Sequence, residues 1–125
     1  MELYVHDLAA LACNAAFELD EISIGRGTGS EATLLTAKWL MDRVDAYPLM
    51  PSMNKLLEAL LRETKMLTVP VIYDTELMKH LEKVAMRLDS VARHPERYRE
   101  NNPEELCLMR QFCNELSRYA QAYDL

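Results

Sequence analysis

The supply of turn-forming residues limits this chain to a fold with few connections. Only three of its 125 residues are glycine, and all three lie between positions 25 and 29. The chain adds just five prolines. A many-stranded β protein needs frequent tight turns, which are built mainly from such residues. Half of the residues are apolar, so the composition favours long helices that bury a core and are joined by few loops.

Apolar side chains recur at helical spacing along five segments. The predicted helices span residues 2–20, 31–45, about 52–67, about 74–93, and from 103 toward the end of the chain. Residues 95–100 are predicted to add one helical turn, and residues 68–73 an extended, buried connector, because Pro70 interrupts a strand-like run. The sequence therefore predicts an all-α fold: one domain over residues 1–125, a compact bundle or orthogonal array of about five helices.

Charge and hydropathy argue against two classes of partner. Twenty acidic and fourteen basic side chains leave a net charge of −6, the wrong sign for holding many phosphates. No run approaches the roughly 18 apolar residues that a membrane-spanning helix requires. We expect neither bulk nucleic-acid binding nor membrane insertion. The histidines and cysteines lie on different helix faces and do not converge as metal ligands must, so no metal or other cofactor is predicted.

The cysteines indicate the compartment. Three cysteines without paired spacing argue against a disulfide framework and for a reducing, cytoplasmic environment. Cys107 falls on a polar helix face, whereas Cys13 and Cys113 fall among apolar residues. We therefore expect Cys107 to be reactive and the other two to be protected.

The predicted helix over residues 31–45 has apolar side chains on two sides. One stripe consists of Leu34, Ala37, Leu40, Met41 and Val44, and a second of Ala32, Leu35 and Trp39. We expect the first stripe to face the core. Leu35 and Trp39 then need another cover, because leaving them in water forgoes roughly 2–3 kcal/mol per large side chain. Either neighbours within the chain enclose this helix, or Leu35 and Trp39 contact a second molecule.

The predicted helix over residues 2–20 has a similar apolar surplus. Its polar stripe is narrow and consists of Asp7, Asn14 and Glu18. We expect this helix to be nearly surrounded, either at the centre of the bundle or in an oligomer contact. Residues 1–25 also contain five carboxylates and neither lysine nor arginine.

A cationic ridge is predicted on the helix over residues 74–93. Lys79, Lys83 and Arg87 follow one another at helical spacing, and no acidic residue four positions away neutralises them. An acidic partner would do so. That partner is either another protein or the acidic first helix of a second copy.

The glycine-containing loop suggests a different role. Gly25, Gly27 and Gly29 alternate before Ser30, with Arg26 between the first two. Backbone amides ahead of a helix can hold an anion. The spacing matches neither a P-loop nor a dinucleotide fingerprint, so a flexible connection is the simpler interpretation.

These features favour a binding protein over an enzyme. No serine or cysteine nucleophile has an identifiable histidine and acid beside it, so no catalytic residue is predicted. We expect a non-enzymatic, cytoplasmic helical protein of the regulator, adaptor or inhibitor type, with self-association into a homodimer as one form of the interaction. The alternative is a small enzyme, or a phosphate or nucleotide binder, that uses residues 25–30.

Overall fold

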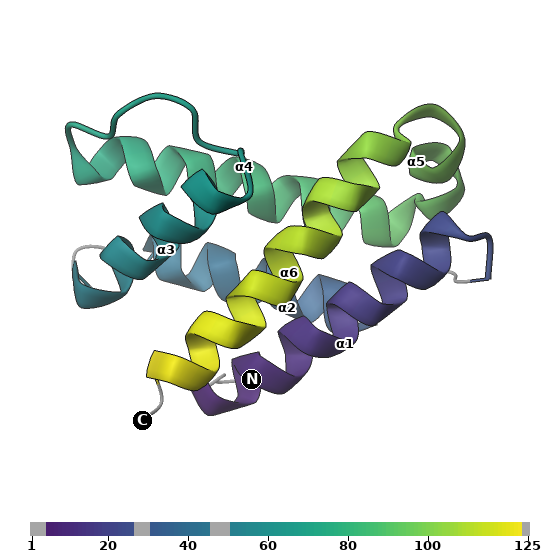
Figure 1. The fold of residues 1–125 in the computed structure, drawn as a ribbon, viewed down its shortest axis with the longest axis horizontal. Helices are drawn as coiled ribbons and strands as arrows, with labels where there is room; N and C mark the ends of the chain where they lie inside the picture. The colour runs from purple at the N-terminus through teal and green to yellow at the C-terminus, as the bar shows by residue number, and fades with distance from the viewer. Residues whose placement is uncertain (1–4, 27–30, 46–50, 124–125) are drawn as a thin grey trace.

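The computed structural model describes residues 5–26, 31–45 and 51–123. These residues form six helices and no strand (Figure 1). The helices are α1 (Val5–Ser23), α2 (Glu31–Asp45), α3 (Pro51–Glu63), α4 (Asp74–Arg93), α5 (Pro95–Asn101) and α6 (Pro103–Tyr123). The all-α prediction is confirmed. The structure has one helix more than the five main helices predicted. The additional helix is α5, the short segment that was predicted as a single helical turn.

The long helices pack in the spatial order α4, α2, α1, α6. α1 and α6 run antiparallel and form the most extensive helix pair, while α2 lies between α1 and α4 (Figure 1). α6 crosses α2 on one side, and α3 packs beside α6. The opposite side of α2 and α4 carries no further described helix, so α1, α2 and α4 share an outward surface.

The core lies between these helices and is made of large apolar side chains. Trp39 and Phe112 are the two largest fully buried residues. Fully buried leucines of α1, α2, α3 and α4 belong to the same core cluster: Leu8, Leu19, Leu40, Leu57, Leu60, Leu61, Leu77, Leu81 and Leu88. Such close-packed burial is the main source of stability in a domain of this size.

The buried face of α2 differs from the predicted one. Its most buried residues are Thr33, Thr36, Ala37, Trp39 and Leu40, an arc that takes in the two threonines and the adjoining edges of both apolar stripes. Leu34, Leu35 and Met41 are only half-buried. The threonines tolerate burial because a threonine hydroxyl can bond to its own helix: the Thr36 hydroxyl donates to the Ala32 carbonyl at 2.8 Å. A prediction that counts threonine as polar therefore misplaces the core face.

Two helices end one turn away from their predicted ends, and both end in the same hydrogen-bond pattern. At α1 the N–H of Arg26 donates to the Glu21 carbonyl and that of Gly25 to the Ile22 carbonyl, with Gly25 at φ +80°. This is a Schellman motif. α3 ends in the same way around Lys65, at φ 60°. A lysine in the left-handed conformation is uncommon, so nothing in the sequence marked this helix end, and α3 was predicted to continue to about residue 67.

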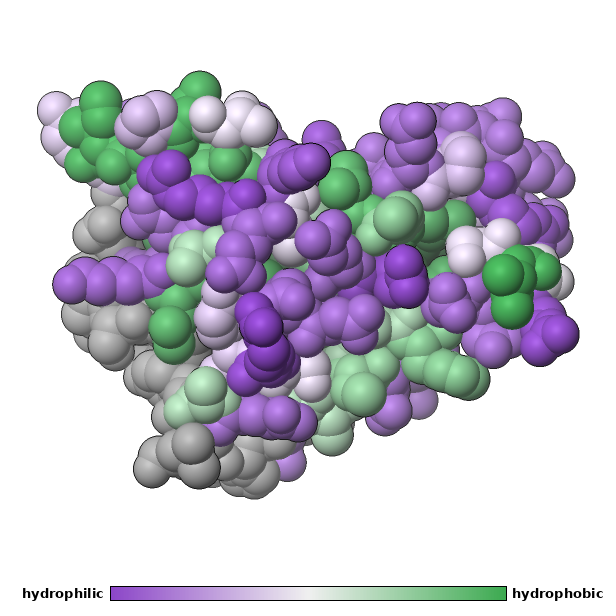
Figure 2. All heavy atoms as spheres, viewed as in Figure 1, coloured by the Kyte–Doolittle hydropathy of each residue, from purple (hydrophilic) through white to green (hydrophobic). Residues whose placement is uncertain are grey.

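The connector between α3 and α4 contains neither helix nor strand, and the prediction that it is buried is wrong. Val69, Ile72 and Tyr73 are exposed, Ile72 to 75%, and hydrophobic atoms cluster over this connector at the upper left of Figure 2. Leu67 and Val71 pack against the core. Thr68, Val69 and Pro70 are exposed in succession, and so are Ile72 and Tyr73, because the connecting segment runs over the surface of the protein.

Polar contacts tie α6 to its neighbours. The buried Ser117 hydroxyl donates to the Ala9 carbonyl of α1 at 2.7 Å. The Tyr119 hydroxyl donates to the Glu63 carboxylate of α3 at 2.6 Å, and this hydrogen bond raises the pKa of Tyr119. Arg118 lies 3.3 Å from the same carboxylate. These exposed α3–α6 contacts contribute at most about 1 kcal/mol each, so they align helices that the apolar core already holds together.

Candidate interaction surface

Two depressions lie on the outward side of α2, one toward α4 and one toward α1. We call them the α2–α4 depression and the α1–α2 depression. Each borders on a large apolar side chain that is mostly exposed: Met86 of α4 is 61% exposed, and Phe17 of α1 is 63% exposed. Large exposed apolar side chains beside concave apolar surface are typical of protein-binding sites.

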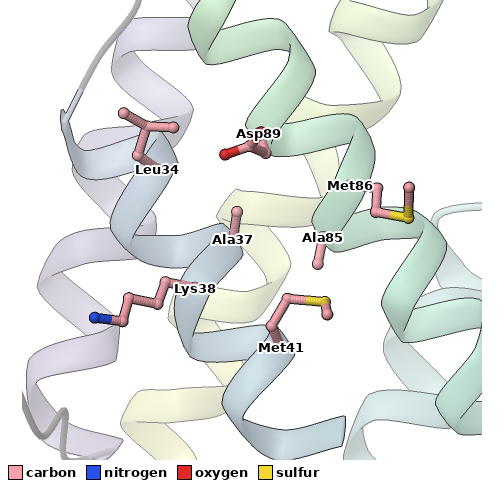
Figure 3. Close-up of a pocket in the computed structure, with 7 residues that line it drawn as sticks. All are labelled: Leu34, Ala37, Lys38, Met41, Ala85, Met86 and Asp89. Atoms are coloured by element: carbon pink, nitrogen blue, oxygen red, sulfur yellow. The ribbon is translucent and has the colours of Figure 1, made fainter.

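The α2–α4 depression has a volume of about 310 Å³. Its lining consists of Leu34, Ala37, Lys38, Met41, Ala85, Met86 and Asp89. Figure 3 shows Met41 pointing toward α4 and Lys38 pointing away from it, with the Asp89 carboxylate directed toward α2. Asp89 also binds Arg93 at 3.0 Å. This depression is therefore apolar at its floor and nearly balanced in charge at its rim.

The α1–α2 depression has a volume of about 370 Å³ and a different charge. Its lining consists of Leu11, Asn14, Phe17, Glu18, Glu31, Ala32 and Leu35. Both ionisable groups are carboxylates. The Glu18 Oε2 atom is buried and has no hydrogen-bond partner among the described residues. This depression is therefore apolar and acidic.

The outward side of α1 continues this apolar surface. Ala10, Cys13 and Phe17 are all exposed and lie on one side of the helix at spacings of three and four residues. The prediction that α1 is nearly surrounded at the centre of the bundle is therefore wrong. α6 and α2 cover only part of the circumference of α1, and the side that bears Ala10, Cys13 and Phe17 stays uncovered. The alternative given above, in which one face of α1 forms a contact between subunits of an oligomer, stays a prediction.

Trp39 and Leu35, the two residues predicted to need a further cover, differ in their exposure. Trp39 is 0% exposed, so the chain itself encloses it, as in the first of the two predicted arrangements. The assignment of Trp39 as a contact residue for a second molecule is therefore corrected. Leu35 is half-buried and lines the α1–α2 depression, where it remains accessible to a partner.

The cationic ridge is shorter than predicted. Arg87 lies 3.2 Å from Glu105 of α6, so an acidic residue distant in sequence neutralises it. Lys79 and Lys83 are exposed and have no ion pair among the described residues. Sequence spacing along one helix could not reveal the Glu105 contact, because it depends on how α6 crosses α4.

The glycine loop is described only in part. The Gly25 and Arg26 amides both donate to α1 carbonyls, so neither is free to bind an anion. Arg26 is exposed, while Gly27, Gly29 and Ser30 lie outside the described residues. In the described part, Gly25 serves to end α1, because its positive φ is readily adopted by glycine.

Phe17, Glu18, Glu31, Leu34 and Met86 were not among the residues that the sequence analysis predicted for an interaction site. Met86 had a usable signal, since it is a large apolar residue on the polar side of an amphipathic helix. Phe17 had none, because residues 2–20 are apolar on most of their circumference. Glu18 and Glu31 come together only because α1 and α2 are neighbours.

The cysteines differ in exposure, and this difference predicts their reactivity. Cys13 and Cys107 are exposed and Cys113 is buried, so the prediction that Cys13 is protected is wrong. Burial raises the pKa of the Cys113 thiol to about 12, which leaves almost no thiolate near pH 8. We expect brief alkylation of the folded protein, followed by peptide mass spectrometry, to modify Cys13 and Cys107 but not Cys113. Equal labelling of Cys113 and Cys107 would contradict this orientation of α6.

The described residues contain no group of three or more His, Cys, Asp or Glu side chains positioned to hold a metal ion. Neither depression is lined by serine, threonine, cysteine or histidine. No described helix has both the length and the hydropathy to cross a membrane.

Comparisons with known proteins add no family to this picture. No protein-family model, curated protein or solved structure matches the chain. The geometry and chemistry of the two depressions are therefore the basis for assigning a function.

Proposed function

We propose that this protein is a non-enzymatic helical interaction module that binds a protein partner through the outward surface of α1, α2 and α4. We define this outer face by six residues: Leu11, Phe17, Leu34, Leu35, Met41 and Met86. The observation that carries the proposal is the pair of depressions that flank α2. The exposed Met86 borders the α2–α4 depression, and the exposed Phe17 borders the α1–α2 depression.

Burial of the outer face would supply binding energy. Completing the burial of a large apolar side chain contributes roughly 1–2 kcal/mol when about two thirds of it is exposed. Phe17 and Met86 lie at opposite edges of the outer face, with half-buried leucines between them. Methionine adapts its shape to different partner surfaces. A partner helix laid along either depression would cover these side chains, as in other helix-in-groove complexes.

The chemistry of the depressions favours recognition over catalysis. Their linings hold no serine, cysteine or histidine that would act as nucleophile or proton carrier in acyl transfer. All three cysteines are free, which suits a reducing compartment, and we accordingly place the protein in the cytoplasm. A regulator, adaptor or inhibitor fits this combination.

Site-specific photo-crosslinking tests the proposal. A photoreactive amino acid is placed at position 86 or 17 and, as a control, at the exposed position 111 of α6. We expect ultraviolet light to produce a discrete covalent adduct in the host cell from positions 86 and 17 but not from 111. Excess unlabelled wild-type protein should suppress the adduct, whereas excess Met86→Asp protein should not.

Two results would count against this function. One is the absence of any adduct at positions 86 and 17. The other is an identical set of adducts from position 111, or suppression that is equally effective with the Met86→Asp protein. A Gln111→Asp variant serves as the matched competitor, because it adds the same charge outside the outer face and should suppress the adduct like the wild type.

A further inference from the structure

We infer that the α1–α2 depression receives a lysine or arginine side chain from a basic amphipathic helix of the partner. This inference rests on the proposed function and deepens it, because it specifies the chemistry of the partner. It follows from the charge, the burial and the apolar lining of this one depression, and its test is independent of the crosslinking described above.

The first step is the absence of a counter-charge. Glu18 and Glu31 both line the depression, and neither has an ion pair among the described residues. Other carboxylates of the chain do have cationic neighbours: Asp20 lies 3.8 Å from Arg110, Glu63 3.3 Å from Arg118 and Glu105 3.2 Å from Arg87. The described lining contains no lysine, arginine or histidine. Among the described residues, the depression thus holds no cation to pair with its two carboxylates.

The second step is the shielding of one carboxylate oxygen of Glu18, a half-buried residue. Its Oε2 atom is shielded from solvent and has no hydrogen-bond donor among the described residues. A buried carboxylate oxygen without a donor is unfavourable, and charged donors form the strongest hydrogen bonds to it. A cation that enters the depression supplies that donor without breaking any contact observed for Glu18 among the described residues.

The third step is the apolar lining, which suits the stem of a long cationic side chain. Leu11, Ala32 and Leu35 line the depression together with Phe17, whose ring is largely exposed. Lysine and arginine place their methylene stems along apolar surface and keep their charge at a polar rim. An exposed aromatic ring adds a cation–π contact. A small inorganic cation would use none of this apolar lining.

Charge argues against the simplest pairing of two copies. α1 contains Asp7, Glu18, Asp20 and Glu21 and no basic residue apart from His6, so pairing α1 with α1 of a second copy would bring carboxylates together. A two-fold arrangement that set α4 of each copy against α1 of the other would bring the exposed Lys79 and Lys83 toward the depression. Neither lysine belongs to the lining of the two depressions, whereas a separate amphipathic helix places its lysines directly beside its own apolar face. We therefore assign a separate basic helix as the occupant, and the test below includes self-association.

The test uses two synthetic peptides that form amphipathic helices of equal length. One has leucine on its apolar face and lysine elsewhere, and the other has glutamate in place of lysine. Binding of each fluorescently labelled peptide to the full chain is measured by anisotropy. We expect the lysine peptide to bind at least about tenfold more tightly, as electrostatic complementarity predicts.

Matched variants distinguish the depression from the overall negative charge. Glu18→Gln/Glu31→Gln is expected to weaken binding of the lysine peptide by about tenfold, the combined effect of losing one ion pair to the half-buried Glu18 and one to the exposed Glu31. Glu82→Gln/Glu100→Gln removes the same charge from exposed positions outside the depression and should weaken it by less than about twofold. Circular dichroism checks that both variants keep the helical content of the wild type.

Three outcomes would overturn the inference: equal affinity for both peptides, equal weakening by the two double variants, or self-association of the chain that Glu18→Gln/Glu31→Gln abolishes. The last would identify a second copy as the occupant. Crosslinks from positions 86 and 17 combined with any of these outcomes would leave the proposed function intact. Peptide binding in the depression without those crosslinks would instead count against the proposed function.

Discussion

Trp39→Glu is expected to leave the protein largely unfolded. The indole is 0% exposed and is one of the two largest buried side chains. Truncating a buried aromatic residue costs about 3–5 kcal/mol, and an unpaired carboxylate in the interior adds further cost. The total free energy of unfolding of a domain of this size is about 5–15 kcal/mol. Circular dichroism and urea titration should show loss of most helical signal and of the cooperative transition.

Trp39→Phe is the matched control for this variant. The Trp39 Nε1 atom is buried and has no hydrogen-bond partner among the described residues, so its removal costs no observed hydrogen bond. The remaining cost is the smaller volume of phenylalanine and the loss of the cation–π contact with Arg43, whose Cζ atom lies 5.0 Å from the ring centroid. We expect a folded protein with a lower urea midpoint. A Trp39→Glu protein that stays folded but loses a binding partner would show that Trp39 belongs to an interface.

The two phenylalanines of the chain should respond to alanine substitution in opposite ways. Phe112 is 0% exposed in the core, whereas Phe17 is 63% exposed on the outer face. We expect Phe112→Ala to lower the free energy of unfolding by about 3–5 kcal/mol. Phe17→Ala should change it by no more than about 0.5 kcal/mol, as for most surface substitutions. Urea denaturation of both variants against the wild type measures the difference.

These two variants also separate stability from binding. Phe17→Ala should keep the stability of the wild type and weaken association through the outer face. Phe112→Ala should lower the melting temperature, and any loss of binding should follow the fraction of unfolded protein. If Phe17→Ala destabilised the protein as much as Phe112→Ala, α1 would be rotated so that Phe17 faces the core, and the α1–α2 depression would not exist as described.

Local patterns in the sequence were sufficient to locate the helices. The apolar period identified every long helix, and α2 and α4 have the predicted bounds. These features depend on residues within one or two turns of each other, which is why a single chain read alone reveals them. The errors at the ends of α1 and α3 have a local cause as well, since Schellman motifs centre on Gly25 and on the left-handed Lys65.

The arrangement of the helices determined everything that concerns the outer face. Periodicity indicates that a helix has an apolar side, but not which neighbour covers it. α2 buries Trp39 because it lies between α1 and α4, and α1 exposes Phe17 because its neighbours α2 and α6 leave that side of the helix uncovered. Arg87 meets Glu105, and Glu18 shares a depression with Glu31, only through tertiary packing. Such contacts join residues on different helices, and their energy depends on distances that no local spacing specifies.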